Sequence, residues 1–138
     1  MVFEQVESKL DLLRSNLEQL DAIPHASYEE FASDKRNVAA TLYLLQTSVQ
    51  ALIDVGGYLV ARRALATPRT SYDVFERLEQ AGLLPTGTAA GVGPMIGFRN
   101  RIVHLYDRVD ARRVYEVLTV HRSDIPRVLA LLLAIPDA

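Results

Sequence analysis

The chain has 138 residues, about half of them apolar, and it contains no cysteine. This length is enough for one buried core and too short for two ordinary domains, so we expect a single domain over residues 1–138. The lack of cysteine excludes disulfides, thiolate metal sites and a cysteine nucleophile. The first residues are acidic where a signal peptide would be basic, and no apolar run suggests a membrane span, so we expect a cytoplasmic protein with no membrane contact.

Charge is distributed unevenly along the chain, although the net charge is only −2. Residues 1–60 contain nine acidic and four basic residues, whereas residues 61–138 contain eight acidic and eleven basic ones. Thirteen of the fifteen basic residues are arginines, and the planar guanidinium suits phosphate better than a lysine does. The C-terminal half is therefore compatible with a nucleic-acid ligand. The alternative, that these arginines serve solubility and surface ion pairs, stays open on composition alone.

The first half of the chain predicts two long helices. Apolar residues alternate at steps of three and four from Phe3 to Leu20, which predicts a helix over about residues 2–20. After Pro24, Ser27 is followed three positions later by Glu30, as in a capping box, and begins a new helical segment. The apolar stripe over residues 38–59 occupies more than one helix face. It predicts the central helix of a bundle, ending at Thr67-Pro68.

Three residues inside this central helix need an explanation. Gly56 and Gly57 each cost about 1 kcal/mol relative to alanine in a helix. A close contact with another helix, or a mild kink, is favoured over a ligand-binding role. Asp54 is either a partly buried carboxylate that orients an arginine or a solvated edge of the helix, and the sequence does not decide between them.

The second half predicts shorter helices with identifiable ends. Ser71 can cap a helix that runs to about Glu79 or Gln80, with Gly82 where a terminating glycine belongs. The remaining predicted helices are one from near Thr88 past His104, one over 110–119, and one over 124–134 with Asp124 as its cap. The predicted fold is therefore all-α, an up-down bundle of about four to six helices.

The segment that carries chemistry lies on the helix that begins near Thr88. At about 100° per residue, its apolar residues fall within an arc of about 80°, which predicts the face turned to the core. These residues are Met95, Phe98, Ile102 and Leu105. Arg99, Asn100 and His104 fall outside the arc, and Asn100 and His104 are one turn apart. Tyr106 lies about 20° from Arg99 if the helix continues that far.

These residue types suit acid–base chemistry at a phosphodiester. Taking up a hydroxyl proton requires a group with a pKa near 7, for which histidine is the natural residue, and His104 is the histidine of this segment. Arg99 offers a fixed cation for the charge that builds on the phosphate oxygens, and Asn100 can orient the imidazole or the phosphate. No metal-ligand cluster such as H-x₃-H is present, so we expect neither a metal nor a cofactor. The alternative for His104 is a surface histidine at a helix end.

The string R-N-x-x-V-H-x-Y, from Arg99 to Tyr106, resembles the R-x₄-H-x-Y signature of HepT toxins in the HEPN superfamily. The likeness extends to the preceding segment Y-D-V-F-E-R-L-E-Q-A-G-L-L and to the V-D that follows the motif. The resemblance implies a HEPN-like helical fold and a metal-independent RNA endonuclease toxin, which would cleave RNA through its own 2′-hydroxyl. It further implies an MntA-type nucleotidyltransferase antitoxin that adenylylates Tyr106. Asp54 and Arg101 are candidates for supporting the catalytic residues Arg99, Asn100 and His104.

One copy of the chain offers no obvious second acid–base group beside His104, because His25 and His121 lie far away in sequence. A two-fold axis near the motif helix would bring two Arg99 and two His104 into one cleft, and the family resemblance implies the same homodimer. A different function also fits the motif: a non-catalytic helical dimer that is the binding partner and substrate module of a nucleotidyltransferase. A third hypothesis is a plain helical scaffold.

Overall fold

The computed structural model describes residues 6–104 and 110–136, and at residues 103 and 104 it describes the backbone only. The described elements are helices: α1 (Glu7–Ala22), α2 (Tyr28–Ala32), α3 (Lys35–Arg62), α4 (Ser71–Gln80), α5 (Thr88–His104), α6 (Ala111–Glu116), a π-helical turn η3 (Val117–His121) and α7 (Asp124–Leu133). The all-α prediction is confirmed. The helix predicted over residues 110–119 is present as α6 and η3, and one more helix than predicted arises because the segment after Ser27 is divided into α2 and α3, with Asp34 at the N-cap of α3.

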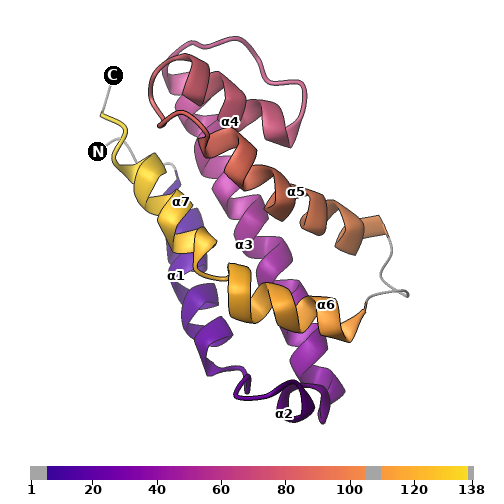
Figure 1. The fold of residues 1–138 in the computed structure, drawn as a ribbon. Helices are drawn as coiled ribbons and strands as arrows, with labels where there is room; N and C mark the ends of the chain where they lie inside the picture. Colours follow the sequence, from indigo (N-terminus) through magenta and orange to yellow (C-terminus); the bar gives the residue numbers. More distant parts are fainter. Residues whose placement is uncertain (1–5, 105–109, 137–138) are drawn as a thin grey trace.

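Helix α3 is the centre of the bundle and contacts every other α-helix (Figure 1). α1 lies along one side of it, α4 packs towards its C-terminal end, α5 contacts its middle, and α6 and α7 fold back across it (Figure 1). The long helices α1, α3, α5 and α7 alternate in direction along the chain, which gives the predicted up-down arrangement (Figure 1). The motif helix α5 is therefore held between α3 and α4.

Side-chain caps fix the starts of the first helices. The Ser27 hydroxyl accepts a hydrogen bond from the Glu30 amide at 3.1 Å, as the capping-box pattern predicted. Asp34 caps α3 by accepting from the Arg36 amide at 2.9 Å. The side-chain hydrogen bond from Arg36 lowers the pKa of Asp34 below its ordinary value, which keeps this cap ionised as the pH falls.

Two predicted caps are wrong by one residue. Thr70, and not Ser71, caps α4 by accepting from the Asp73 amide at 3.0 Å, which leaves the Ser71 side chain free to point elsewhere. Asp124 lies in the first turn of α7 rather than at the N-cap, and its carboxylate pairs with Arg127 at 2.8 Å. In both cases adjacent residues have similar capping chemistry, so the sequence alone does not select the one at the cap.

The ends of α3 and α4 share one mechanism. At the end of α4, Gly82 has φ +76°, and the amides of Gly82 and Leu83 donate back to carbonyls of the last turn, as predicted for a terminating glycine. α3 ends at Arg62, earlier than the predicted Thr67-Pro68. Ala64 takes a positive φ of 52° there, and the Leu65 amide donates to the Val60 carbonyl at 3.0 Å. A non-glycine residue in this conformation is not foreseen from sequence.

Helix α3 is long and apolar enough to cross a membrane by length and composition alone, so the expectation that no apolar run suggests a span is wrong for it. More than half of that apolar stretch is buried inside the fold. α3 packs against α1, α4, α5 and α7, and its apolar composition is therefore that of a core helix.

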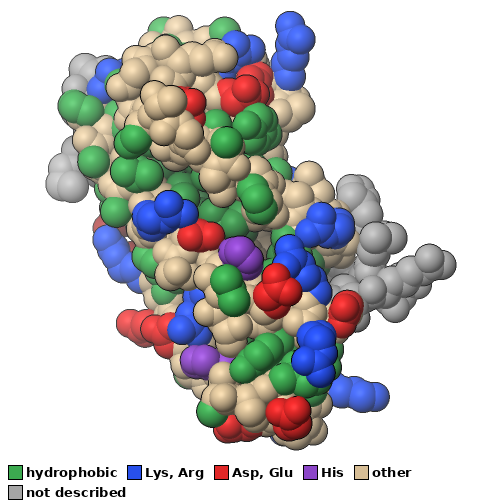
Figure 2. All heavy atoms as spheres, in the orientation of Figure 1, with side chains coloured by type: hydrophobic (Ala, Val, Ile, Leu, Met, Phe, Trp, Pro, Cys, Tyr) green, Lys and Arg blue, Asp and Glu red, His purple; other side chains and the backbone are tan. Residues whose placement is uncertain are grey.

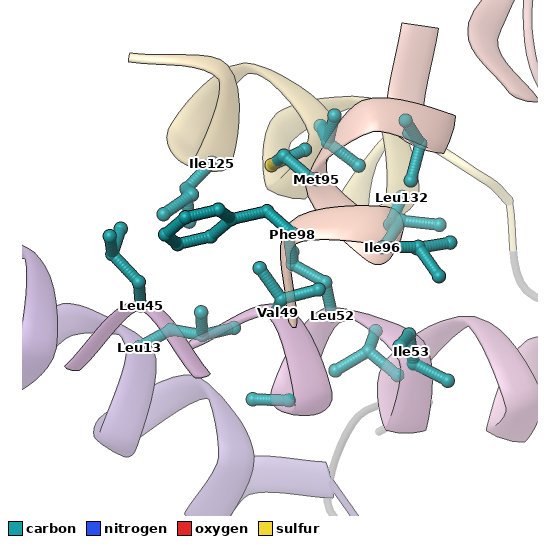
Figure 3. Packing of buried hydrophobic residues seen from close by; sticks show 14 of the residues in the cluster. Leu13, Leu45, Val49, Leu52, Ile53, Met95, Ile96, Phe98, Ile125 and Leu132 are labelled. Carbon is teal, nitrogen blue, oxygen red and sulfur yellow. The ribbon is translucent and has the colours of Figure 1, made fainter. Parts of the chain in front are cut away.

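Two contacts hold the motif helix and α4 against α3. A Cβ built on Gly56 of α3 would lie 2.8 Å from Val74 Cγ1 of α4, so the predicted close approach is confirmed there, whereas Gly57 has nothing within 4 Å. The Phe98 ring of α5 points between Leu45 of α3 and Ile125 of α7 (Figure 3). The side of α5 that carries Phe98 is therefore fixed in the core, and this determines where the next residue, Arg99, points.

Candidate active site

The motif helix α5 buries the side chains predicted to face the core. Met95, Phe98 and Ile102 are all buried, while Leu105 lies outside the described residues. Arg99 is half-buried and Asn100 is exposed. His104 is the last residue of α5, four positions after Asn100, so the helix register places both on one face. The side chain of His104 and all of Tyr106 lie outside the description.

The Arg99 guanidinium is held by side chains from three helices. Its Nη1 donates to Oε1 of Gln50 on α3 at 2.7 Å. Its Nη2 donates to Oδ1 of Asn100 at 2.7 Å and to Oγ of Ser71, at the start of α4, at 3.4 Å. The head group is thus fixed where α3, α4 and α5 meet, and two of the predicted residues, Arg99 and Asn100, are brought into direct contact.

The recorded partners of Arg99 within the described chain are all neutral. Arg77 of α4 provides the contrast, because it pairs with the Asp73 carboxylate at 3.2 Å. No acidic side chain in the described part of the chain is recorded as a partner of Arg99, so the described residues orient it without neutralising it. Its buried Nε, like that of Arg77, has no partner among the described residues.

Asp54 reaches Arg99 through an intermediate. Its Oδ1 accepts from Nε2 of Gln50 at 2.9 Å, and Gln50 in turn accepts from Arg99. Its Oδ2 forms an ion pair with Nζ of Lys9 on α1 at 3.0 Å, and both side chains are partly exposed. The structure therefore combines the two sequence hypotheses for Asp54: it is a partly exposed residue at the helix edge, and it is linked to an arginine through Gln50.

Arg101, the other predicted supporting residue, occupies a different place. It is exposed, and its guanidinium carbon lies 6.0 Å from the centroid of the Phe98 ring. Around the helix it lies on the other side of Asn100 from Arg99, since each residue adds about 100° of rotation. Arg101 therefore adds positive charge near the motif without a recorded contact to Arg99.

Sequence reasoning missed Gln50 and assigned Ser71 only a capping role. The available signal for Gln50 was its position four residues before Asp54, which places both on one face of α3. That spacing does not reveal the partner, because the contact with Arg99 depends on how α3 and α5 pack. For Ser71 no local signal distinguishes a cap from a residue that contacts the site.

A shallow surface hollow lies beside Ser71. The apolar side chains of Ile53 on α3 and Val74 on α4 line it, together with the start of α4 and the residues before it: Pro68, Arg69, Thr70 and Ser71. Ser71 belongs both to this hollow and to the Arg99 contacts.

The other two histidines are occupied elsewhere in the fold. His25 contacts the Ile23 carbonyl, and His121 lies 3.6 Å from the Asp124 carboxylate. Among residues 6–102 and 110–136 no group of three or more His, Asp or Glu side chains is arranged to hold a metal ion. On the face drawn in Figure 2, basic and acidic side chains are interspersed, so the excess of arginine in the second half does not form a single-sign patch there.

The helical bundle has the fold of solved HEPN toxins. A solved structure of a tri-AMPylated Shewanella oneidensis HEPN toxin in complex with MNT antitoxin superposes with a TM-score of 0.83 at 21% identity, covering 95% of this chain and 98% of that one. A toxin–antitoxin complex with AMP-PNP superposes with a TM-score of 0.82 at 20% identity, covering 94% and 98%. At these identities the likeness establishes the fold.

The chain belongs to the ribonuclease HepT-like family, whose model matches residues 13–132. Among curated proteins it is 26% identical to the tRNA nuclease HepT of Aphanizomenon flos-aquae over 121 residues, covering 88% of this chain and 82% of that protein. It is also 26% identical to the mRNA nuclease HepT of Shewanella oneidensis over 100 residues, covering 72% and 75%. The resemblance inferred from the motif is therefore confirmed at the level of the family.

Proposed function

We propose that this protein is the toxin of a toxin–antitoxin pair and cleaves RNA without a metal ion. The observation that carries the proposal is the Arg99 guanidinium, which is fixed by three neutral oxygen atoms and so keeps its positive charge for a ligand. A scissile phosphate is the ligand that such a group suits, because charge develops on its oxygens in the transition state.

The proposed chemistry divides the work among three residues. Arg99 binds the non-bridging phosphate oxygens. Because Oδ1 of Asn100 accepts from Arg99, its NH₂ group is the end of the amide that can donate to the phosphate. His104 takes the proton from the 2′-hydroxyl, whose oxygen attacks phosphorus, and the 5′-oxygen leaves with a proton from a second acid. The product carries a 2′,3′-cyclic phosphate.

A homodimer around α5 would provide the second acid. Within residues 6–102 and 110–136 the remaining histidines, His25 and His121, contact other groups, so one chain does not offer a matching partner for His104. Two copies related by a two-fold axis would supply two histidines and two arginines to one composite site. Curated relatives named as a tRNA nuclease and an mRNA nuclease support RNA as the substrate class.

Regulation by a nucleotidyltransferase antitoxin forms part of the proposal. The structural relatives are toxins solved with their antitoxins, one of them AMPylated. Adenylate attached to Tyr106, two residues after His104, would place a phosphate near the anion site and repel RNA. Because the proposed substrate is cellular RNA, the cytoplasm is the compartment in which the protein would act.

The test is cleavage of a mixed-sequence RNA in EDTA by the purified wild type and by His104→Ala, with analysis of the product ends. We expect cleavage by the wild type, cyclic phosphate ends, and a loss of at least about 100-fold in the variant. His121→Ala, the matched control on η3, should cleave as the wild type does. Cleavage that disappears in EDTA would contradict the metal-independent mechanism.

The same preparations separate the nuclease from the alternative function. If dimeric protein free of adenylate on Tyr106 leaves RNA intact but is still modified by the nucleotidyltransferase, the chain is its non-catalytic partner. In that case His104→Ala would weaken nucleotide or partner binding without changing any cleavage.

A further inference from the structure

A line of contacts runs from α1 through α3 to the motif helix. It consists of Lys9, Asp54, Gln50 and Arg99, and each neighbour is within 3.0 Å of the next. Gln50 is the only uncharged member of this line. Its place between a carboxylate and a guanidinium, two groups that ordinarily pair directly, requires an explanation.

The orientation of the Gln50 amide is dictated by its neighbours. An ionised Asp54 can only accept hydrogen bonds, and Arg99 can only donate them. The NH₂ end of Gln50 must therefore face Asp54 and the oxygen must face Arg99, as the contacts of 2.9 and 2.7 Å show. Asp54 thus fixes the orientation of the Gln50 amide, and the amide fixes the position of the Arg99 guanidinium. The amide itself has no net charge.

Lys9 completes the electrostatic arrangement. It pairs with the Asp54 oxygen that faces away from Gln50, so the negative charge of Asp54 is balanced on the α1 side. Arg99 is thus separated from this carboxylate by a neutral side chain, and the carboxylate is itself paired. A glutamate at position 50 would have nearly the same shape and would neutralise Arg99.

We propose that Gln50 is a positioning residue that holds the Arg99 guanidinium in place while leaving its charge uncompensated, with Asp54 and Lys9 fixing the amide. This inference rests on the proposed function, because it assigns a purpose to the free charge of Arg99. The inference goes beyond the proposed function because it names a residue outside the motif, on another helix, that controls how strongly Arg99 binds an anion.

The decisive experiment moves the carboxylate from position 54 to position 50, one turn earlier on α3. The double variant Gln50→Glu/Asp54→Asn keeps the net charge, the side-chain sizes and the hydrogen-bonding pattern, because the introduced asparagine amide would donate where the Gln50 amide now does. The carboxylate, however, then contacts Arg99 directly. Asp54→Asn alone is the control for loss of the ion pair with Lys9. Gln19→Glu on the exposed side of α1 is the control for a glutamine replaced by glutamate at a distance from Arg99.

The primary readout is binding of a single-stranded 2′-O-methyl RNA, which cannot be cleaved, over a range of salt concentrations. The slope of log affinity against log salt is about 0.7 per neutralised phosphate for single strands. In the double variant each Arg99 is neutralised by Glu at position 50 and no longer neutralises a phosphate. We therefore expect the magnitude of the slope to fall by about 0.7 for each Arg99 that contacts the RNA, whereas Gln19→Glu leaves the slope unchanged. Thermal unfolding of each variant verifies that the fold is retained.

The second readout is the cleavage rate. The double variant should lose about 100-fold in kcat, the scale expected when a fixed charge no longer meets the transition state. Gln50→Met, which keeps the length and removes the hydrogen bonds, should lower kcat about tenfold and leave the salt slope unchanged. A double variant with the wild-type slope and rate would overturn the role of Gln50. If the wild type itself leaves RNA intact, the nuclease proposal fails, and the slope still decides on Gln50.

Discussion

At the scale of single residues, what distinguishes Arg99 is the geometry of its contacts more than its charge. The terminal nitrogens of the guanidinium have partners on three helices, and the planar fork reaches Gln50, Ser71 and Asn100 at once. A lysine ammonium carries the same charge on one atom and cannot span these positions. The site therefore demands arginine for its shape.

Replacement of Arg99 by lysine tests this requirement. We expect Arg99→Lys to lower RNA cleavage by about 100-fold, because the charge is no longer held by two fixed nitrogens. The salt dependence of RNA binding should stay close to that of the wild type, since the charge is kept. Steady-state kinetics and salt titrations measure the two effects. Near wild-type cleavage by Arg99→Lys would show that charge alone is sufficient.

The limits of sequence reasoning are also clear at this scale. The buried face of α5 follows from helical periodicity, and Met95, Phe98 and Ile102 are buried as predicted. The same periodicity places Arg99 and Asn100 off that face. It does not report that Gln50, about fifty positions earlier, meets Arg99, because that contact results from the packing of two helices. The role of Asp54 was undecided for the same reason.

At the scale of helices, Gly56 sets the distance between α3 and α4. The nearest atom to a Cβ at this position belongs to Val74, a β-branched residue whose side chain has little freedom on a helix. α4 begins with Ser71, one of the Arg99 partners, so the close approach also positions the site. The adjacent Gly57 points into open space.

These two glycines make a matched pair of variants. We expect Gly56→Ala to destabilise the protein by about 1–3 kcal/mol, because the new methyl group would force α3 and α4 apart. Gly57→Ala should be neutral or stabilising by up to about 1 kcal/mol through helix propensity. Urea denaturation followed by circular dichroism measures both. Equal effects of the two substitutions would show that the contact with Val74 is not limiting.

Helix boundaries were predictable to the extent that they depend on local chemistry. The Ser27 cap and the Gly82 terminus follow from residue types with strong positional preferences. The choice of Thr70 over Ser71 as the cap does not follow from residue type, because both have a hydroxyl that can cap a helix. The contact of Ser71 with Arg99 joins residues far apart in the sequence, so neighbouring residues do not reveal it. The early end of α3 depends on a positive φ at Ala64, a conformation that alanine seldom adopts.

At the scale of the whole molecule, the central question is how many chains make one active site. Two copies around α5 would combine their His104 residues, and a homodimer stays a prediction of the family resemblance. Subunit mixing tests it. When wild type is allowed to exchange with an excess of His104→Ala, we expect activity to fall with the square of the wild-type fraction, since both histidines are needed.

The control for that experiment is mixing with His121→Ala, which should leave total activity unaffected by the fraction of variant. Light scattering on the same samples establishes the number of chains. A linear decline in the His104→Ala mixture would show that each chain works alone, and the second acid would then have to come from the same copy.

The order of the contacts along the chain has a consequence for synthesis. Lys9, Gln50, Asp54 and Ser71 all precede Arg99, so they emerge from the ribosome before it does. The contacts between α1 and α3 likewise lie wholly within the part of the chain that is made before α5. A chain interrupted before α5 therefore has the groups that would aim the arginine but lacks the arginine itself. Unfinished copies of a protein proposed to cut RNA would be harmless to the cell that makes them.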